Sequence, residues 1–218
     1  MAEKILIESK SGSGKTTSLR HLDPEKTMVI QVVKKRLPFP EAKNWKMWDK
    51  DSQTGSIFQT TSFEGVQAVI QKMEEVGKKI IVIDDFVYLF ASRVMADVDT
   101  KGYEKWSFLG KAYYDLINTI DSIDDDMRVY ILTHTDTDEN GFVKMKTAGK
   151  LVDNLLTPEG QFNIVLGARR TETGAVFITN GSTVDPYKSP MEMFKDKEIP
   201  NDLKTVDDTI CNFYGIED

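Results

Sequence analysis

Eight consecutive residues near the amino terminus, Ser9 to Thr16, combine glycines, hydroxyls and one lysine at the spacing of a phosphate-binding loop. In such a loop, backbone N–H groups surround phosphate oxygens, the lysine reaches the terminal phosphates, and the following hydroxyl binds Mg²⁺. Lys15 and Thr16 match these last two roles, and Gly12 and Gly14 allow the close approach and the dihedrals that a Cβ atom would forbid. The predicted nucleotide-binding residues are Ser11, Gly12, Ser13, Gly14, Lys15, Thr16 and Thr17.

The elements around this loop favour the same interpretation. An apolar run over residues 4–8 predicts a buried strand before the loop, and a helix is expected to begin near Thr16, so that its N-terminal dipole adds to anion binding. Ser9 stands where the pattern G-x-x-x-x-G-K-[ST] has its first glycine, and we expect some strain in a turn at this residue. The alternative is a glycine-serine loop with a chance Gly-Lys-Thr sequence.

Polar residues follow two further apolar runs and predict the rest of a catalytic site. Asp84 and Asp85 follow residues 80–83, at the carboxyl end of a predicted parallel strand, where open α/β sheets bind ligands. We expect Asp84 to hold Mg²⁺ through water and Asp85 to orient an attacking water; the alternative is an ordinary Asp-Asp turn. His134 follows the predicted strand 127–133 and either contacts the terminal phosphate or is a hydrogen-bonded residue at a strand end. Lys15, Asp85 and His134 are therefore the predicted catalytic residues, and Thr16 and Asp84 the predicted metal ligands.

The composition limits the classes of protein to be considered. The 218 residues include one cysteine, Cys211, and two histidines, which exclude an internal disulfide and a Cys/His metal cluster. We expect no membrane span and no leader segment, since no apolar run of about 18 residues occurs, and hence a cytoplasmic protein. The net charge of −7 argues against nucleic-acid binding over the whole surface but not against a local basic groove.

The order of apolar patterns predicts an α/β fold with a mostly parallel central sheet flanked by helices, a C-terminal β-hairpin and a short terminal helix. We expect one domain over residues 1–218, with residues 181–218 as a C-terminal extension strapped to it. The expected strands are 4–8, 27–33, 79–85, 127–133, 162–167 and 175–179. The expected helices are 63–76, capped by Ser62 and ended by Gly77, a long helix containing residues 106–120, and a last helix capped by Asn201 and ended by Gly215. One or two helical turns are expected over residues 151–156, and residues 34–59, 92–105, 135–150 and 181–200 are expected to be irregular.

Basic side chains in the connecting segments are candidates for contacts with DNA or with a neighbouring subunit. These candidates are Arg93, Lys101, Lys144, Lys146, Lys150, Arg169 and Arg170. The alternative for the arginine pair is a solvated turn. Trp45 and Trp48 lie among lysines, so they could stack on bases, although packing against the edge of the sheet is the other interpretation.

Several stretches together resemble a known protein family. They are Lys4 to Arg20, Leu22-Asp23-Pro24, Lys35-Arg36-Leu37-Pro38-Phe39, Ile83-Asp84-Asp85, Thr133-His134-Thr135, Lys146-Thr147-Ala148-Gly149-Lys150, Lys188-Ser189-Pro190 and Ile199-Pro200-Asn201-Asp202-Leu203. Over nearly its whole length the chain resembles the phage-encoded, RecA-like ATP-binding proteins of the Sak type, which are recombinases reduced to the ATPase core. The Leu-Pro-Phe and Lys-Thr-Ala-Gly-Lys stretches are the more specific parts of this resemblance.

The resemblance implies a RecA-like P-loop ATPase that uses ATP and Mg²⁺, binds single-stranded DNA and promotes annealing or strand pairing in phage recombination. It implies γ-phosphate sensing by His134, DNA-facing loops at 92–105 and 135–150, and either DNA or trans-subunit contacts for Lys146 and Lys150. It also implies a homo-oligomer in ring or filament form, a single-strand-binding protein as partner, and the cytoplasm of the bacterial host. Lys34 and Lys35 stand where RecA proteins carry the catalytic glutamate, which implies slow, DNA-stimulated hydrolysis or reliance on Asp85.

Two other classes of protein remain open. A nucleotide kinase also uses a phosphate-binding loop, although kinase lids bring several arginines to the phosphates and this chain has six arginines with one adjacent pair. A nucleotide-gated assembly module, such as a loader or a packaging accessory, would bind ATP and act through protein contacts. Phosphate transfer to a nucleoside or nucleotide would identify the first, and ATP binding without DNA binding would identify the second.

Overall fold

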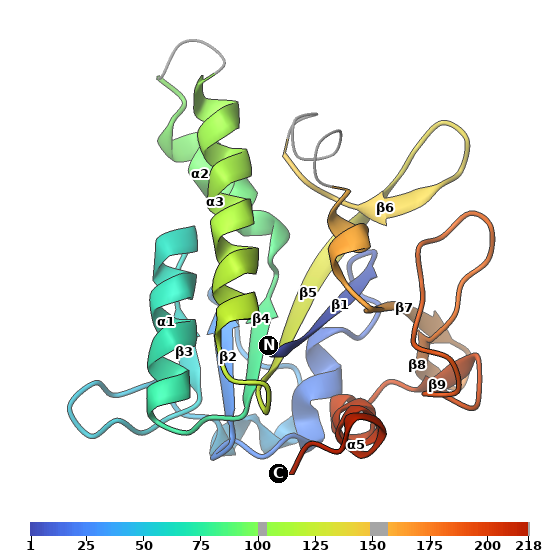
Figure 1. The fold of residues 1–218 in the computed structure, drawn as a ribbon, viewed down its shortest axis with the longest axis horizontal. Coiled ribbons are helices and arrows are strands. Elements are labelled where there is room, and N and C mark those ends of the chain that lie inside the picture. Colours follow the sequence, from blue (N-terminus) through green and yellow to red (C-terminus); the bar gives the residue numbers. More distant parts are fainter. Residues whose placement is uncertain (100–103, 149–156, 218) are drawn as a thin grey trace.

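The computed structural model describes residues 1–99, 104–148 and 157–217. Within these residues, nine strands form one sheet in the order β3-β2-β4-β5-β1-β7-β8-β9, with β6 paired to β5 (Figure 1). The strands are β1 (Glu3–Ser9), β2 (Thr27–Gln31), β3 (Ile57–Gln59), β4 (Ile80–Asp84), β5 (Arg128–Thr137), β6 (Val143–Met145), β7 (Ile164–Thr171), β8 (Gly174–Ile178) and β9 (Glu198–Pro200). All pairs from β3 to β7 are parallel, and β6, β8 and β9 pair antiparallel. The predicted mostly parallel α/β sheet is confirmed.

Helices cover both faces of the sheet (Figure 1). They are α1 (Phe63–Glu75), α2 (Val87–Ala96), α3 (Glu104–Ser122) and α5 (Leu203–Tyr214), with the 3-10 helices η1 (Thr16–His21), η2 (Pro40–Asn44) and η3 (Pro158–Gln161). Residues of α1, α2 and α3 share an apolar cluster with Leu6, whereas residues of η1 and α5 share the opposite cluster with Ile5 and Ile7. This alternation within β1 explains why its apolar run is continuous, since a strand covered on both faces needs apolar side chains on both.

The helices α1, α3 and α5 lie where the apolar patterns predicted helices, although Phe213 of the predicted apolar face of α5 is exposed. Ser62 caps α1 by accepting a hydrogen bond from the N–H of Gly65, and Gly77 follows the helix at φ +74°. The predicted apolar positions of α1 are buried, and α5 ends at Gly215 in the left-handed conformation. The cap of α5 was predicted wrongly, because Asp202 rather than Asn201 accepts from Lys204 N–H. The N–H of Asn201 instead binds the carbonyl of Ala175, which ties this residue to the sheet.

Three segments expected to be irregular contain short regular elements. Residues 34–59 include η2 and the edge strand β3, residues 135–150 include the end of β5 and β6, and residues 181–200 include β9. The predicted strand 27–33 ends at Gln31, and the helix after the phosphate loop is a 3-10 helix of only six residues. Strands of three residues are too short to produce a periodic pattern, which is why they were missed.

Two predicted loops are also partly helix or strand. The segment 92–105 begins inside α2 and ends inside α3, so it is not one continuous loop. Arg169 and Arg170 lie within β7, because β7 and β8 pair as far as Thr171 and Gly174 and leave a two-residue turn. Lys101, Lys150 and the expected helical turns at 151–156 lie outside the described residues.

The two tryptophans of the 34–59 segment differ in burial. Trp45 is 6% exposed and packs edge-on against Phe39 at a ring-centroid distance of 6.4 Å, as the packing interpretation requires. Trp48 is half-buried against the cluster formed by α1 and α3, and it lines a separate cavity of about 350 Å³ with Phe58 and Met73.

Candidate nucleotide-binding site

The phosphate loop follows β1 and has the dihedrals that its glycines permit. Gly12 has φ +79° and Gly14 has φ +103°, both in the region that L side chains rarely adopt. A Cβ atom on Gly14 would also lie 3.1 Å from both the Cβ of Ala175 and the Oδ1 of Asn201, whereas a Cβ on Gly12 would meet nothing within 4 Å. Gly12 is therefore required for its conformation, and Gly14 for its conformation and for close packing.

Ser9, which replaces the first glycine of the motif, is the last residue of β1 and does not have a positive φ. The expected strain at this position is therefore absent from the described backbone. Its hydroxyl instead hydrogen-bonds Ser13 and accepts from Lys15 Nζ at 2.9 Å. The serine thus adds a contact within the loop that a glycine could not make.

Lys15 is held inside the loop. Its Nζ donates to the carbonyls of Ser9 and Lys10 at 3.0 and 3.1 Å, and the residue is 6% exposed. Burial lowers the pKa of Lys15 to about 8, while the carboxylates of Asp84 and Asp85 act in the opposite direction. The ammonium is therefore directed at the curve of backbone that would surround a phosphate.

Thr16 and Asp84 supply adjacent oxygen atoms at the carboxyl end of β4. The Oγ1 of Thr16 donates to the two carboxylate oxygens of Asp84 at 3.1 and 3.2 Å, and Asp84 is 1% exposed. Burial raises the pKa of Asp84 to about 6. A hydroxyl beside a carboxylate fits the oxygen preference of Mg²⁺, and Mg²⁺ usually takes only one or two protein ligands besides phosphate and water. In the described ranges, no group of three His, Cys, Asp or Glu side chains forms a metal cluster.

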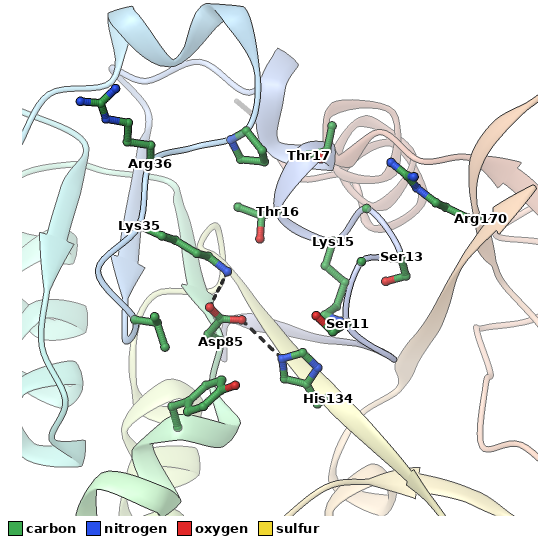
Figure 2. Close-up of a pocket in the computed structure, with 15 residues that line it drawn as sticks. Ser11, Ser13, Lys15, Thr16, Thr17, Lys35, Arg36, Asp85, His134 and Arg170 are labelled. Carbon is green, nitrogen blue, oxygen red and sulfur yellow. Dashed lines mark hydrogen bonds and ion pairs between the residues drawn. The ribbon is translucent and has the colours of Figure 1, made fainter.

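The carboxylate of Asp85 contacts two basic side chains, those of Lys35 and His134. Its Oδ2 lies 2.5 Å from Lys35 Nζ, and its Oδ1 lies 3.6 Å from His134 Nε2 (Figure 2). Burial acts to raise the pKa of Asp85, but His134 and Lys35 outweigh burial and hold the pKa below its usual value. Asp85 also has φ +63°, a conformation that costs energy for a residue with a Cβ atom and is common at functional sites.

These elements surround one open cavity of about 510 Å³ (Figure 2). All seven predicted nucleotide-binding residues line it, and so do the predicted catalytic residues Asp85 and His134. The side chains that complete its wall are Val33, Lys35, Arg36, Pro38, Tyr88 and Arg170. The structure therefore brings together the segments that follow β1, β2 and β4 with His134 of β5, as expected for the carboxyl edge of a parallel sheet.

Two neighbouring cavities share walls with this one. A cavity of about 600 Å³ shares Gly14, Thr17 and Arg170 and extends between the β7–β8 turn and the start of α5. A cavity of about 410 Å³ shares Ser11, Tyr88 and His134 on the opposite side.

The candidate DNA or trans-subunit cations have different surroundings. Arg93 pairs with Glu64 and Asp97, and Arg169 pairs with Glu198 at 2.5 Å, so both are engaged within the chain. Lys144 lies on β6. Lys146 lines the 410 Å³ cavity, and its N–H donates to the carbonyl of His134 at 2.8 Å. Arg170 lines the phosphate-loop cavity of its own chain.

The sequence patterns did not predict that Lys35, Arg36 and Tyr88 line the cavity. The position of Lys35 could have indicated its place in the wall. It follows β2 closely, and β2 pairs with β4 so that the last residue of β2, Gln31, lies beside Asp84. The signal for Tyr88 was its position three residues after Asp85, one helical turn further on. Its ring meets that of His134 edge-on at a centroid distance of 6.0 Å.

Comparisons with known proteins leave the family open. No protein-family model matches the chain, and a search of curated proteins found no match. Among the residues that the structure describes, no helix is long and apolar enough to cross a membrane.

Proposed function

We propose that this protein is a RecA-like P-loop ATPase that binds ATP with Mg²⁺ and couples the nucleotide to the binding of single-stranded DNA. The observation that carries the proposal is the common cavity of the phosphate loop, Thr16, Asp85 and His134, with Asp84 directly behind Thr16. Lys15 and the loop N–H groups would hold the phosphates, and Thr16 and Asp84 would hold Mg²⁺. Mg²⁺ bound there would neutralise charge on the phosphates.

The 600 Å³ cavity supports binding of a whole nucleotide rather than of free phosphate. It meets the phosphate-loop cavity at Gly14 and Thr17, on the side of the loop away from Asp85 and His134. The ribose and base of ATP would extend from the phosphates into this space. Arg170 lies at the boundary of the two cavities, where its charge would contact phosphate oxygens of the same subunit.

The 410 Å³ cavity supports the coupling to DNA. It carries Lys10 and Lys146 beside Tyr88, which is 44% exposed. Lysines that neutralise backbone phosphates next to an aromatic ring on which a base can stack are typical of single-strand binding. Because His134 and Tyr88 belong to both cavities, a nucleotide that fixes His134 would also fix the wall of the DNA site.

The biological role that we propose follows the family that the sequence resembles. The protein would promote annealing or strand pairing in phage recombination, as a homo-oligomer beside a single-strand-binding protein in the cytoplasm of a bacterial host. Since contacts to phosphates would dominate, the affinity for DNA should fall steeply with salt and depend little on sequence.

The test is ATP hydrolysis with and without single-stranded DNA at low and moderate salt. We expect turnover that DNA stimulates, that needs Mg²⁺ and that Lys15→Ala abolishes. Lys43→Ala, which removes an exposed lysine of η2, is the matched control and should behave as the wild type. Turnover that is indifferent to DNA, with no DNA retained at low salt, would refute the coupling.

The same assay distinguishes the alternative functions. Tight ATP binding without DNA binding would favour a nucleotide-gated assembly module. Arg36 and Arg170 both line the cavity, which is the feature that a nucleotide kinase would need, so nucleosides and nucleoside monophosphates are added as possible acceptors. Transfer of phosphate to one of them would replace the ATPase proposal.

A further inference from the structure

Lys35 occupies an asymmetric position beside the two acidic residues of the site. Its Nζ lies 2.5 Å from Asp85 Oδ2 and 3.8 Å from Asp84 Oδ2. Burial acts to lower the pKa of Lys35, but the two carboxylates outweigh burial and raise the pKa, so the side chain carries its full charge at neutral pH. One ammonium therefore serves two carboxylates, one of which is also bonded to Thr16.

The backbone of Lys35 is fixed, whereas its side chain has room to move. Its carbonyl accepts a hydrogen bond from the Nε2 of the buried Gln31 at 2.9 Å, and Gln31 is held in turn by Gln59. The side chain itself is 38% exposed and lines the open phosphate-loop cavity. A lysine has a flexible four-carbon stem, so its ammonium can change partners without movement of the chain.

A cation bound between Thr16 and Asp84 would be close to this ammonium. Two positive charges near the same carboxylate repel each other, and the repulsion is larger at a partly buried site than in water. The remaining anion within reach of Lys35 would be the terminal phosphate, because Lys35 lines the same cavity as Lys15 and the phosphate loop.

We propose that Lys35 determines specificity for nucleoside triphosphate over diphosphate by moving its ammonium from Asp84 and Asp85 to the γ-phosphate. This inference rests on the proposed nucleotide binding. With a diphosphate, no γ-phosphate is present, and Lys35 stays on Asp85 and competes with the metal at Asp84. With a triphosphate, Lys35 gains a charge-assisted hydrogen bond and Asp85 keeps His134 as its basic partner.

Lys34 provides a matched control in the neighbouring position. It carries the same charge and is exposed, but it is not among the described residues that line the phosphate-loop cavity. Lys34→Ala therefore removes one positive charge from the same segment without removing the contact to Asp85. Both variants lose one positive charge. A difference in nucleotide affinity between Lys34→Ala and Lys35→Ala is therefore due to the position of the ammonium group and not to the net charge.

The experiment measures affinity by calorimetry for Mg²⁺-bound adenylyl imidodiphosphate, a non-hydrolysed triphosphate analogue, and for Mg²⁺-bound ADP. In Lys35→Ala we expect at least a tenfold weaker affinity for the analogue and less than a twofold change for ADP. The Mg²⁺ concentration that half-saturates ADP binding should fall at least about threefold, because the competing ammonium is gone. Lys34→Ala should leave all three values unchanged.

Equal losses for the analogue and ADP in Lys35→Ala, or an unchanged Mg²⁺ requirement, would overturn the role of Lys35. Equal effects of Lys34→Ala and Lys35→Ala would do the same. Lys35→Gln carries the same expectations and replaces Lys35→Ala if that variant does not fold. Failure of the proposed function gives a different result, since wild type and Lys15→Ala would then bind neither nucleotide or bind them equally well.

Discussion

The two ends of β5 contribute to ion pairs that differ in the exposure of the basic partner and in geometry. At its start, Arg128 and Asp207 are 0% and 1% exposed and form two parallel hydrogen bonds of 3.0 and 2.9 Å. Near its other end, His134 lies 3.6 Å from Asp85 at an open cavity, and Lys35 contacts the same carboxylate from a half-exposed position. We call Arg128 and Asp207 the closed pair, because solvent does not reach them, and we call the group of His134, Asp85 and Lys35 the open end, because it borders the cavity.

The carboxylate of Asp207 accepts three hydrogen bonds, two from Arg128 and one from Tyr130. Tyr130 donates to Asp207 Oδ1 at 2.6 Å, and Arg128 donates in addition to the carbonyl of Asp126. Because Asp207 belongs to α5, the network holds this helix on the sheet. At the open end, by contrast, each group has exposed surface or a second possible partner, so a ligand can replace one protein contact by another. The two cases thus differ in whether a ligand can reach the ion pair.

Breaking the closed pair should have the largest effect on stability. Arg128→Ala leaves Asp207 buried without its cation, which costs about 3–5 kcal/mol of unfolding free energy. Lys35→Ala, at a position with a 38% exposed side chain, should cost less than about 1 kcal/mol. Urea denaturation of the two variants measures the difference. Equal losses of unfolding free energy in the two variants would show that the exposure of an ion pair does not determine how much it contributes to stability.

The double variant Arg128→Met with Asp207→Leu sharpens this test. Replacing a buried ion pair by apolar side chains of similar size removes both charges together, so no charge stays unpaired. We expect a smaller loss of unfolding free energy than in Arg128→Ala. A loss as large as in the single variant would mean that the specific hydrogen bonds, including that of Tyr130, dominate over the buried charge.

At the open end, substitution should affect coupling rather than folding. His134→Gln should change the unfolding free energy by less than about 1 kcal/mol and nucleotide affinity by less than about threefold, because the side chain is 18% exposed and touches Asp85 at 3.6 Å. The stimulation of turnover by single-stranded DNA should fall at least about tenfold, since His134 is in the wall between the two cavities.

Tyr88 supplies the controls for this prediction. Tyr88→Phe keeps the ring that meets His134 and should keep the stimulation by DNA, whereas Tyr88→Ala should lose it. Turnover with and without DNA is measured for all three variants. A decrease of basal and stimulated turnover by the same factor in His134→Gln would place this residue in catalysis and not in coupling.

The sequence predicted the parts of the site whose chemistry is local. The phosphate loop and the pair Asp84-Asp85 depend on residues close to one another in the chain, and the long helices repeat apolar residues at helical spacing. Ser62 was correct as a cap because its partner is three residues away. Asp202 was missed as a cap because the neighbouring Asn201 was already bound to β8, a contact that only the folded sheet creates.

The parts that were not predicted depend on contacts between distant residues. Lys35 and Asp85 are separated by 50 positions, and Arg128 and Asp207 by 79. Which of many lysines meets a carboxylate is decided by the register of β2 on β4 and not by any local pattern. Arg169 was a candidate binding residue for the same reason, because its partner Glu198 is 29 positions away. Arg93 differs, because one of its two partners, Asp97, is only four positions away and forms an i,i+4 pair that a local pattern can indicate.

Glu8 is a third kind of ionisable position, because it belongs neither to a buried ion-pair network nor to the lining of the phosphate-loop cavity. It lies beside Thr133 in the β1–β5 register, is 0% exposed, and none of its carboxylate oxygens has a hydrogen-bond partner in the described part of the chain. Burial raises the pKa of Glu8 to about 8, and Glu159 and Asp185 act in the same direction, whereas Lys15 opposes them.

Glu8 should therefore affect stability in a way that depends on pH. The folded protein keeps the proton up to about pH 8, while the unfolded chain releases it near the ordinary glutamate pKa of 4.5, so stability must fall as pH rises between these values. Glu8→Gln removes this dependence. We expect equal stability near pH 5 and, at pH 8, a variant more stable than wild type by at least about 1 kcal/mol, or about 2–4 °C in Tm.

Glu41→Gln, at an exposed residue of η2, should follow wild type at every pH. A constant difference between Glu8→Gln and wild type from pH 5 to 8 would mean that Glu8 finds a partner in solution, and its burial would then resemble the closed pair of Arg128.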